Sequence, residues 1–170
     1  MKFPINSNTL FYHGTDAYFE TFKDRYRGSN TFWDNTVHGF FFSEKKENAQ
    51  MFGNTIITAK LEILKTLDLR LQSIFKEESQ ASLIWEILSG EKLENCKALV
   101  KLDEEIGIGE LGEMRDSLNN EIAHKMMLAT GYDSIISDFG DNQPEYIVFK
   151  ANQIKIIFID RGSKERKIGR

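Results

Sequence analysis

Apolar residues alternate in short runs near both ends of the chain and recur at helical spacing in its middle. Within residues 55–62, Ile57, Ala59 and Leu61 fall on one side, which predicts a half-buried strand. Further strands, most of them rich in aromatic or β-branched residues, are predicted at 9–13, 39–43, 67–69, 132–137, 145–149 and 153–159.

Helical patterns fill much of the chain between these strands. Helices are predicted over 16–22 (one or two turns), 44–52 with Ser43 as N-cap, 73–89, and 117–129 with Ser117 as N-cap. Gly53, Gly90 and Gly131 follow the last three, and glycine commonly ends a helix. The charged segment 91–113 has no clear pattern. Strands toward both ends with helices between them favour an α+β fold over repeated βαβ units.

Two segments are predicted to be irregular. Residues 138–142 form a polar turn. Residues 23–38 form a long polar loop that contains Phe32 and Trp33 as well as two arginines, which is unusual for a simple connection. Loops of this length are often lids or binding segments.

Length and composition indicate one ordinary globular domain over residues 1–160, followed by a basic tail over 161–170. The 170 residues are 41% apolar and 28% charged. Thirteen Phe and five Tyr are many for this length and predict an aromatic-walled core or cleft. A net charge of −4 disfavours tight electrostatic binding of nucleic acid.

The sequence gives no sign of a disulfide, a metal centre or a membrane segment. Cys96 is the single cysteine, so an internal disulfide is ruled out, and this suits a reducing compartment. His, Cys and acidic residues do not cluster at ligand spacing, so we predict no metal. The N-terminal residues lack the apolar core of a signal peptide, and no run of about 18 apolar residues occurs. We therefore expect a cytoplasmic protein with no membrane partner.

Three separated segments carry the candidate chemistry. Tyr12-His13-Gly14-Thr15 ends the first predicted strand. Gly39-Phe40-Phe41-Phe42-Ser43 is an aromatic strand, with Phe52 ten residues beyond Phe42; alternation points Phe41 away from its two neighbours. Pro144-Glu145-Tyr146-Ile147-Val148-Phe149 places a carboxylate at the start of an apolar strand, where a proline is tolerated because it has no N–H to donate. Each segment alone is more often structural than functional.

Together and in this order, the three segments resemble the ADP-ribosyltransferase family. The closest resemblance is to its diphtheria-toxin-like branch, which includes the poly(ADP-ribose) polymerases and has histidine-glycine, then tyrosine, then glutamate at these places. Phe41 and Phe52 stand here where the branch has tyrosines. The resemblance covers about residues 11–159. It implies an ADP-ribosyltransferase-like fold, in which two packed, mainly antiparallel sheets flanked by helices form a cleft for NAD.

The resemblance also implies roles at the first segment. The family uses NAD as co-substrate, cleaves its nicotinamide–ribose bond and passes ADP-ribose to an acceptor. His13 would hydrogen-bond the adenosine ribose. Gly14 would offer its backbone to the nicotinamide amide, since a residue without Cβ allows close approach. Thr15 would add a hydroxyl nearby.

Phe41, Phe52 and Glu145 would act on the reacting half of NAD. By resemblance, the two rings sandwich the nicotinamide and Glu145 binds the 2′-hydroxyl of the nicotinamide ribose. The physics agrees, because NAD carries a cationic nicotinamide ring that aromatic faces attract by about 0.5–2 kcal/mol. The ribose becomes an oxocarbenium ion in the reaction, and a fixed carboxylate stabilises that charge.

Three further residues are weaker candidates. Arg25 and Arg27 would meet the NAD diphosphate, since guanidinium groups pair well with phosphate, although two solvated loop arginines fit the sequence equally well. Gln143 lies two residues before Glu145, where some family members, mostly of the other branch, have a residue that orients the acceptor. His38 and His124 are expected to be structural or exposed.

The sequence therefore predicts a mono-ADP-ribosyltransferase whose partners are NAD and an acceptor protein, similar to bacterial effectors, toxins or phage-encoded enzymes. Two alternatives stay open. One is a catalytically inactive NAD-binding or interaction module on the same fold, for which the replacement at Phe41 leaves room. The other is a nucleic-acid-directed transferase, which the acidic balance disfavours and the basic tail permits.

Overall fold

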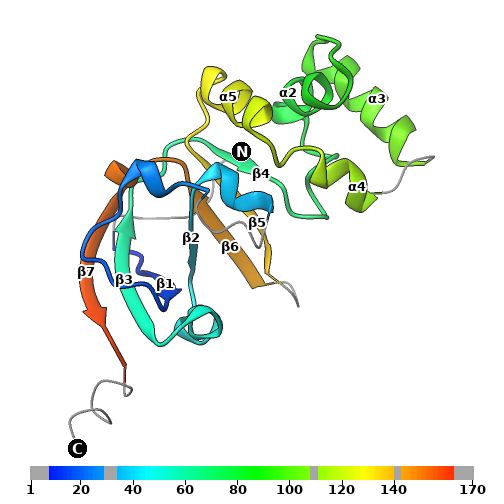
Figure 1. The fold of residues 1–170 in the computed structure, drawn as a ribbon. Coiled ribbons are helices and arrows are strands. Elements are labelled where there is room, and N and C mark those ends of the chain that lie inside the picture. Colours follow the sequence, from blue (N-terminus) through cyan, green and yellow to red (C-terminus); the bar gives the residue numbers. More distant parts are fainter. Residues whose placement is uncertain (1–7, 29–33, 108–110, 140–142, 163–170) are drawn as a thin grey trace, which may run out of the picture.

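Seven strands form the centre of the protein, whose computed structural model describes residues 8–28, 34–107, 111–139 and 143–162. The strands are β1 (Phe11–Thr15), β2 (Phe40–Ser43), β3 (Thr55–Leu61), β4 (Thr66–Asp68), β5 (Ser134–Phe139), β6 (Gln143–Val148) and β7 (Ile154–Asp160) (Figure 1). Their order across the sheet is β4-β5-β6-β2-β1-β3-β7. All neighbours are antiparallel except β4 and β5.

The longer helices come from the segment between β4 and β5. The helices are α1 (Lys46–Ala49), α2 (Glu78–Ser89), α3 (Asn95–Ile106), α4 (Leu111–Asp116) and α5 (Glu121–Ala129), with short 3-10 turns η1 (Asp24–Tyr26), η2 (Asp34–His38), η3 (Gln50–Phe52) and η4 (Ala151–Gln153). Figure 1 shows α2 to α5 gathered beside the β4 end of the sheet. The predicted α+β class is confirmed. In the described part of the chain, no helix has the length and apolar character needed to cross a membrane.

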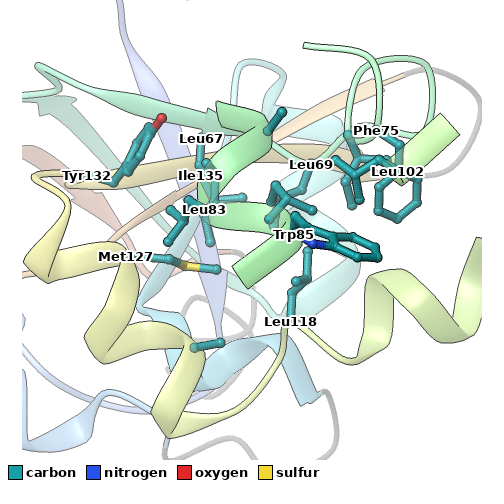
Figure 2. Close-up of a cluster of buried hydrophobic side chains, with 14 of the residues drawn as sticks. Leu67, Leu69, Phe75, Leu83, Trp85, Leu102, Leu118, Met127, Tyr132 and Ile135 are labelled. Carbon is teal, nitrogen blue, oxygen red and sulfur yellow. The ribbon is translucent and has the colours of Figure 1, made fainter. Parts of the chain in front are cut away.

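The main hydrophobic core lies between these helices and the β4–β5–β6 part of the sheet. Figure 2 shows Leu67 and Ile135 from the strands packed with Leu83 of α2 and Met127 of α5. Leu102 of α3 is also fully buried in this cluster. Each such side chain stabilises the fold by about 1.5–3 kcal/mol relative to an exposed one. This core fixes the strand that carries Glu145.

A second, aromatic core lies on the opposite face of the sheet. Phe11 packs against Tyr146 with ring centroids 5.1 Å apart and planes at 73°, and Phe22 packs against Phe40 at 5.4 Å and 68°. These edge-to-face contacts are the favoured geometry for aromatic pairs. Phe42 is buried here too, whereas Phe41 packs toward the main core, so the predicted alternation along β2 is confirmed.

The sheet has a narrow join in the middle. β1 pairs with β3 at every position from Phe11 to Thr15, but with β2 only through Tyr12 and Ser43. The prediction of two packed sheets is therefore wrong in one respect, because this pair links the halves β4-β5-β6-β2 and β1-β3-β7 into one sheet. Beyond the pair, none of the described strands pairs with residues 13–15 on the β2 side.

Two predicted helical features near this join are wrong. Residues 16–22 form bends rather than helical turns. Here Thr15 accepts a hydrogen bond from the Ala17 N–H at 3.0 Å and Asp16 accepts one from the Asn54 N–H at 2.9 Å, and such side-chain bonds compete with helix formation. Ser43 belongs to β2 and donates to the Lys45 carbonyl at 2.9 Å, so it does not cap α1.

The helical region differs from the prediction at its boundaries. α2 begins at Glu78 rather than at residue 73, and α5 begins at Glu121, where the Asn120 side chain accepts from the Ala123 N–H at 2.8 Å. The unassigned segment 91–113 holds α3 and the start of α4. Phe32 and Trp33 of the predicted binding loop, residues 140–142 of the predicted turn, and residues 163–170 of the predicted basic tail lie outside the described residues.

Candidate active site

A pocket of about 900 Å³ lies at the narrow join between β1 and β2 and takes in residues from all three candidate segments. Six of the sequence-predicted site residues line it, namely His13, Gly14, Thr15, Phe41, Phe52 and Glu145. The three weaker candidates Arg25, Arg27 and Gln143 do not. The separation of β1 and β2 beyond Tyr12 therefore coincides with the place where the candidate chemistry gathers.

Glu145 is the most unusual group in this pocket. It lies on β6, paired with Ser43 of β2 on one side and Ser137 of β5 on the other, and is 7% exposed. No hydrogen bond from a described residue reaches its carboxylate, and since no fully buried side-chain oxygen among the described residues lacks a partner, the carboxylate oxygens keep some access to the pocket. Burial of the rest of the group raises its pKa to about 7. A buried carboxylate without a partner is costly, so its persistence indicates that the oxygens are kept available to a ligand in the pocket.

His13 is held in a defined tautomer. Its Nδ1–H donates to the Phe41 carbonyl oxygen at 2.7 Å, which ties β1 to β2 where their backbone pairing stops. Burial lowers the pKa of the imidazole, so the ring is neutral near pH 7. The rings of Phe22 and Phe42 pack on it at 5.1 and 5.4 Å. The remaining nitrogen, Nε2, is then an acceptor suited to a hydroxyl group.

Gly14 is required by the packing of the chain itself. A Cβ at this position would lie 1.7 Å from the Ala49 carbonyl oxygen and 2.6 Å from its carbon, both backbone atoms of α1. Any side chain would therefore push α1 away from β1. This reason is independent of the close ligand approach that the sequence suggested.

The aromatic side chains of the site come from two elements. Phe41 of β2 lines the pocket and is half-buried, with part of its ring packed against the main core, while Phe52 lies at the end of η3 and is more exposed. Both contribute apolar surface to one pocket, as a stacked ring would need. Thr15 also lines the pocket, and its hydroxyl accepts a hydrogen bond from the Ala17 N–H.

The two arginines are engaged elsewhere. The Arg27 guanidinium donates to the Val37 carbonyl and forms an ion pair with Glu121 at 2.9 Å, which fixes η1 to α5. Arg25 lies over the Tyr26 ring at 4.9 Å. Their predicted contact with a diphosphate thus gains no support from the geometry.

Two charged residues of the pocket were not identified from the sequence. Lys23 is the one lysine or arginine among the described lining residues. Asp138 also lines it, although the sequence placed this residue in a turn. Extending the predicted strands 132–137 and 145–149 toward each other by one residue, as an antiparallel pair, would have placed Asp138 opposite Pro144. Among the described residues, no group of three His, Cys, Asp or Glu side chains could hold a metal ion.

The other histidines form a buried structural pair. His38 Nε2–H donates to the Leu118 carbonyl at 2.8 Å, so its Nδ1 accepts from His124 Nδ1–H at 3.2 Å. Phe149 packs against both rings. Burial is the main cause that lowers the pKa of each to about 4. The sequence left these two histidines as structural or exposed, and the structure shows both of them buried.

This pair predicts a loss of stability in acid. Unfolding restores ordinary histidine pKa values near 6.5, so the unfolded chain binds more protons than the folded chain between pH 6.5 and 4. The lowered pKa of His13 likewise reduces the stability of the fold in acid. The raised pKa of Glu145 has the opposite effect, because between pH 7 and 4.5 the folded chain binds more protons at this group and gains stability as the pH falls. In a Glu145→Gln background, we expect the free energy of unfolding to fall by about 3 kcal/mol or more from pH 7 to pH 5.

Urea denaturation at both pH values measures this change. Adding His124→Leu to the same background should make the fall smaller, because one titrating group is removed. An unfolding free energy that stays level between the two pH values would show that these imidazoles are not buried in the neutral form.

Comparison with known proteins identifies a family for this chain. The sequence model of a protein family described as "ADP-Ribosyltransferase in polyvalent proteins" matches residues 7–164. No curated protein matches the chain. A solved structure described as "Crystal structure of an anti-CRISPR protein" is similar with a TM-score of 0.45 and 16% identity, over 91% of this chain and 99% of that one. Since the family match spans all three candidate segments and nearly the whole sequence, the chain belongs to the family of ADP-ribosyltransferases in polyvalent proteins.

Proposed function

We propose that the protein is a mono-ADP-ribosyltransferase of the diphtheria-toxin-like kind, which cleaves NAD at the nicotinamide–ribose bond and transfers ADP-ribose to a protein side chain. The observation that carries the proposal is the buried carboxylate of Glu145, which lines one pocket with His13 and Phe41 and receives no hydrogen bond from the residues that the structure describes. A purely structural strand end would leave such a carboxylate in solvent.

In this proposal, NAD lies across the join between β1 and β2. The nicotinamide ring stacks between Phe41 and Phe52, and His13 Nε2 accepts a hydrogen bond from a hydroxyl of the adenosine ribose. Lys23, rather than the two arginines, faces the diphosphate, since it is the cation among the described lining residues. Contacts with a charged phosphate oxygen are among the stronger hydrogen bonds.

Glu145 supplies the charge that the reaction needs. As the bond from C1′ to the nicotinamide nitrogen breaks, its electron pair neutralises the ring and the positive charge moves to the ribose. An ionised carboxylate in a poorly hydrated pocket stabilises this oxocarbenium ion more than it stabilises the ground state. Because the pKa of Glu145 is about 7, the ionised fraction of the free protein rises across neutral pH, and a bound cationic ring favours ionisation further.

Phe41→Ala is expected to weaken NAD binding by about 5- to 30-fold. The substitution removes one of the two stacking faces, which together with cation–π attraction contributes about 1–2 kcal/mol. Isothermal titration with NAD measures the dissociation constant. Phe158→Ala is the matched control, because Phe158 is 61% exposed on β7 and lies outside the pocket. Equal dissociation constants for wild type and Phe41→Ala would remove Phe41 from the binding site.

Incubation with NAD labelled in its adenylate part tests the activity. The proposal predicts label on protein after the purified chain is added to a cell lysate, together with release of free nicotinamide. Label that is removed by nuclease would instead indicate a nucleic-acid acceptor. NAD that binds but releases no nicotinamide in the lysate would indicate an inactive binding module and would contradict the proposal.

A further inference from the structure

One side of the pocket comes from the segment between β1 and β2. Four residues of this segment line the pocket, namely Lys23, Tyr26, Gly28 and Thr36, and we call them the loop wall. They lie in or beside the 3-10 turns η1 and η2, so no ladder of strand hydrogen bonds fixes them. The position of the loop wall therefore depends on side-chain contacts made by its neighbours.

Arg27 makes such contacts from the middle of the loop wall. Its guanidinium donates to the carbonyl of Val37, which follows Thr36 in the chain, and to the two carboxylate oxygens of Glu121 at 2.9 and 3.4 Å. The hydrogen bond to Arg27 is the main cause that lowers the pKa of the Glu121 carboxyl. One side chain thus joins two separated parts of the loop wall to each other and to the first residue of α5.

α5 is a firm support because it is built into the main hydrophobic core. Ala123 and Met127 of this helix are buried there. His38, at the end of η2, is held against α5 by its buried hydrogen bond to His124. The η2 side of the loop wall is therefore fixed by buried contacts, whereas the η1 side meets α5 through the guanidinium of Arg27, which is 24% exposed.

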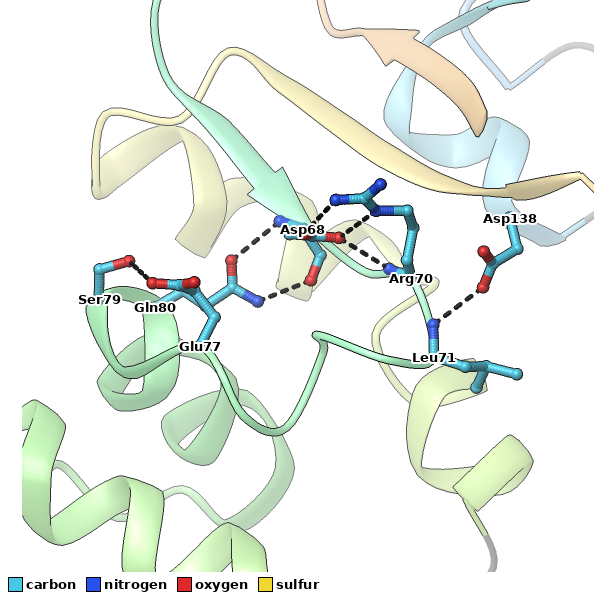
Figure 3. Close-up of polar contacts among 7 residues, drawn as sticks. All are labelled: Asp68, Arg70, Leu71, Glu77, Ser79, Gln80 and Asp138. Carbon is cyan, nitrogen blue, oxygen red and sulfur yellow. Dashed lines mark hydrogen bonds and ion pairs between the residues drawn. The ribbon is translucent and has the colours of Figure 1, made fainter. Parts of the chain in front are cut away.

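The contacts of a second arginine serve the fold at a distance from the pocket lining. Figure 3 shows Arg70 donating to the buried Asp68 carboxylate at 3.0 and 2.9 Å, while Gln80 of α2 binds both the N–H and the carbonyl of Asp68. These contacts tie the end strand β4 to α2, and the three residues lie outside the pocket lining. Arg27 differs, because the residues on both sides of it in the chain line the pocket.

We propose that Arg27 is a positioning residue, which holds the loop wall in the place that NAD requires before NAD binds. The inference rests on the proposed function and adds a residue that controls affinity for NAD without touching it. When only a fraction of the free protein has the wall in place, the apparent dissociation constant rises in proportion. The bound complex keeps the same wall, so the rate of bond cleavage in that complex does not change.

Arg27→Ala should raise the dissociation constant for NAD, measured by isothermal titration, by about 5-fold or more, because both contacts of the guanidinium are lost. The KM for NAD in nicotinamide release should rise by the same factor, while kcat stays within about 2-fold of the wild-type value. A residue with a structural role alone would lower the stability of the fold without this division between KM and kcat.

Glu121→Gln separates the two contacts of Arg27. It should raise the dissociation constant by less than about 3-fold, because it removes a partly exposed ion pair and leaves the hydrogen bond to Val37. In the Arg27→Ala background it should add nothing further. Lys125→Ala is the matched control, because it removes the same charge from an exposed position of α5 and should leave the dissociation constant unchanged.

Two further measurements follow the loop wall itself. Arg27→Lys keeps the charge but lacks the planar fork that reaches two partners, so its dissociation constant should lie between those of wild type and Arg27→Ala. Amide hydrogen exchange over residues 23–28 should be faster in Arg27→Ala than in wild type, and saturating NAD should remove most of the difference.

The inference is overturned if Arg27→Ala binds NAD within about 2-fold of wild type, if its loss of activity lies in kcat rather than KM, or if Lys125→Ala weakens binding as much. Should Arg27→Ala fail to fold, a wild-type dissociation constant for Arg27→Lys would overturn it. Absence of NAD binding by the wild type would instead overturn the proposed function, and this inference with it.

Discussion

Replacing Glu145 with Gln is expected to lower the rate of ADP-ribose transfer by at least about 100-fold. Removing one preorganised group that stabilises developing charge in a buried site typically costs that much. Glutamine keeps the size of the side chain but cannot offset the charge on the ribose. Release of nicotinamide from NAD, followed in a single assay for wild type and variant, measures the effect.

The Glu145→Gln variant should lose its transfer activity although its fold is more stable than that of the wild type. The pKa of Glu145 is about 7 in the fold and near 4.5 when unfolded, so the folded chain binds the extra proton between these values. Its ionisation therefore destabilises the fold increasingly as pH rises through this window. Glu145→Gln should raise the free energy of unfolding by about 3 kcal/mol at pH 8 and by less than about 1 kcal/mol at pH 5.

Glu104→Gln provides the control for this variant. Glu104 is an exposed residue of α3, and its substitution should change neither activity nor stability. Full nicotinamide release by Glu145→Gln would contradict the assigned chemistry. An unfolding free energy equal to that of wild type at pH 8 would contradict the burial of an unpaired carboxylate.

Gly14→Ala is expected to lower the free energy of unfolding by about 3 kcal/mol or more. The added methyl would overlap the Ala49 backbone carbonyl, which cannot turn aside as a flexible side chain can. Relief requires α1 to move, and α1 together with η3 carries Asn48, Ala49 and Phe52 of the pocket wall. Thermal unfolding should occur roughly 6–12 °C lower, and NAD binding should weaken with it.

Gly112→Ala is the matched control for Gly14→Ala. Gly112 lies in α4, where a Cβ would meet nothing within 4 Å. Alanine is the better helix former, so this substitution should be neutral or stabilise by up to about 1 kcal/mol. If Gly14→Ala unfolds at the same temperature as wild type, the close packing of α1 on β1 is wrong.

The strands that build the pocket could be predicted because their signals are local. Phe40 to Phe42 alternate between two cores, and Ile147 and Val148 are apolar on both faces of a central strand, so sequence pattern and burial agree. The order of the three motif segments, which the resemblance supplied, then placed His13, Phe41 and Glu145 at one site. Each of the three lines the same pocket.

Features that depend on distant contacts could not be predicted. The single pair of Tyr12 and Ser43 decides between one sheet and two, and no local pattern encodes it. Asp138 enters the pocket through the register of β5 on β6. α3 was missed although Ala98 and Leu102 lie one helical turn apart and are buried, because the charged residues and the three glycines of segment 91–113 hid its pattern.

The most direct test of the central claim is a crystal structure with a non-cleavable NAD analogue bound. The account predicts the nicotinamide ring between Phe41 and Phe52, a hydroxyl of its ribose about 3 Å from the Glu145 carboxylate, and another ribose hydroxyl at His13 Nε2. An analogue bound outside the pocket between β1 and β2, or one that leaves Glu145 without any contact, would contradict it.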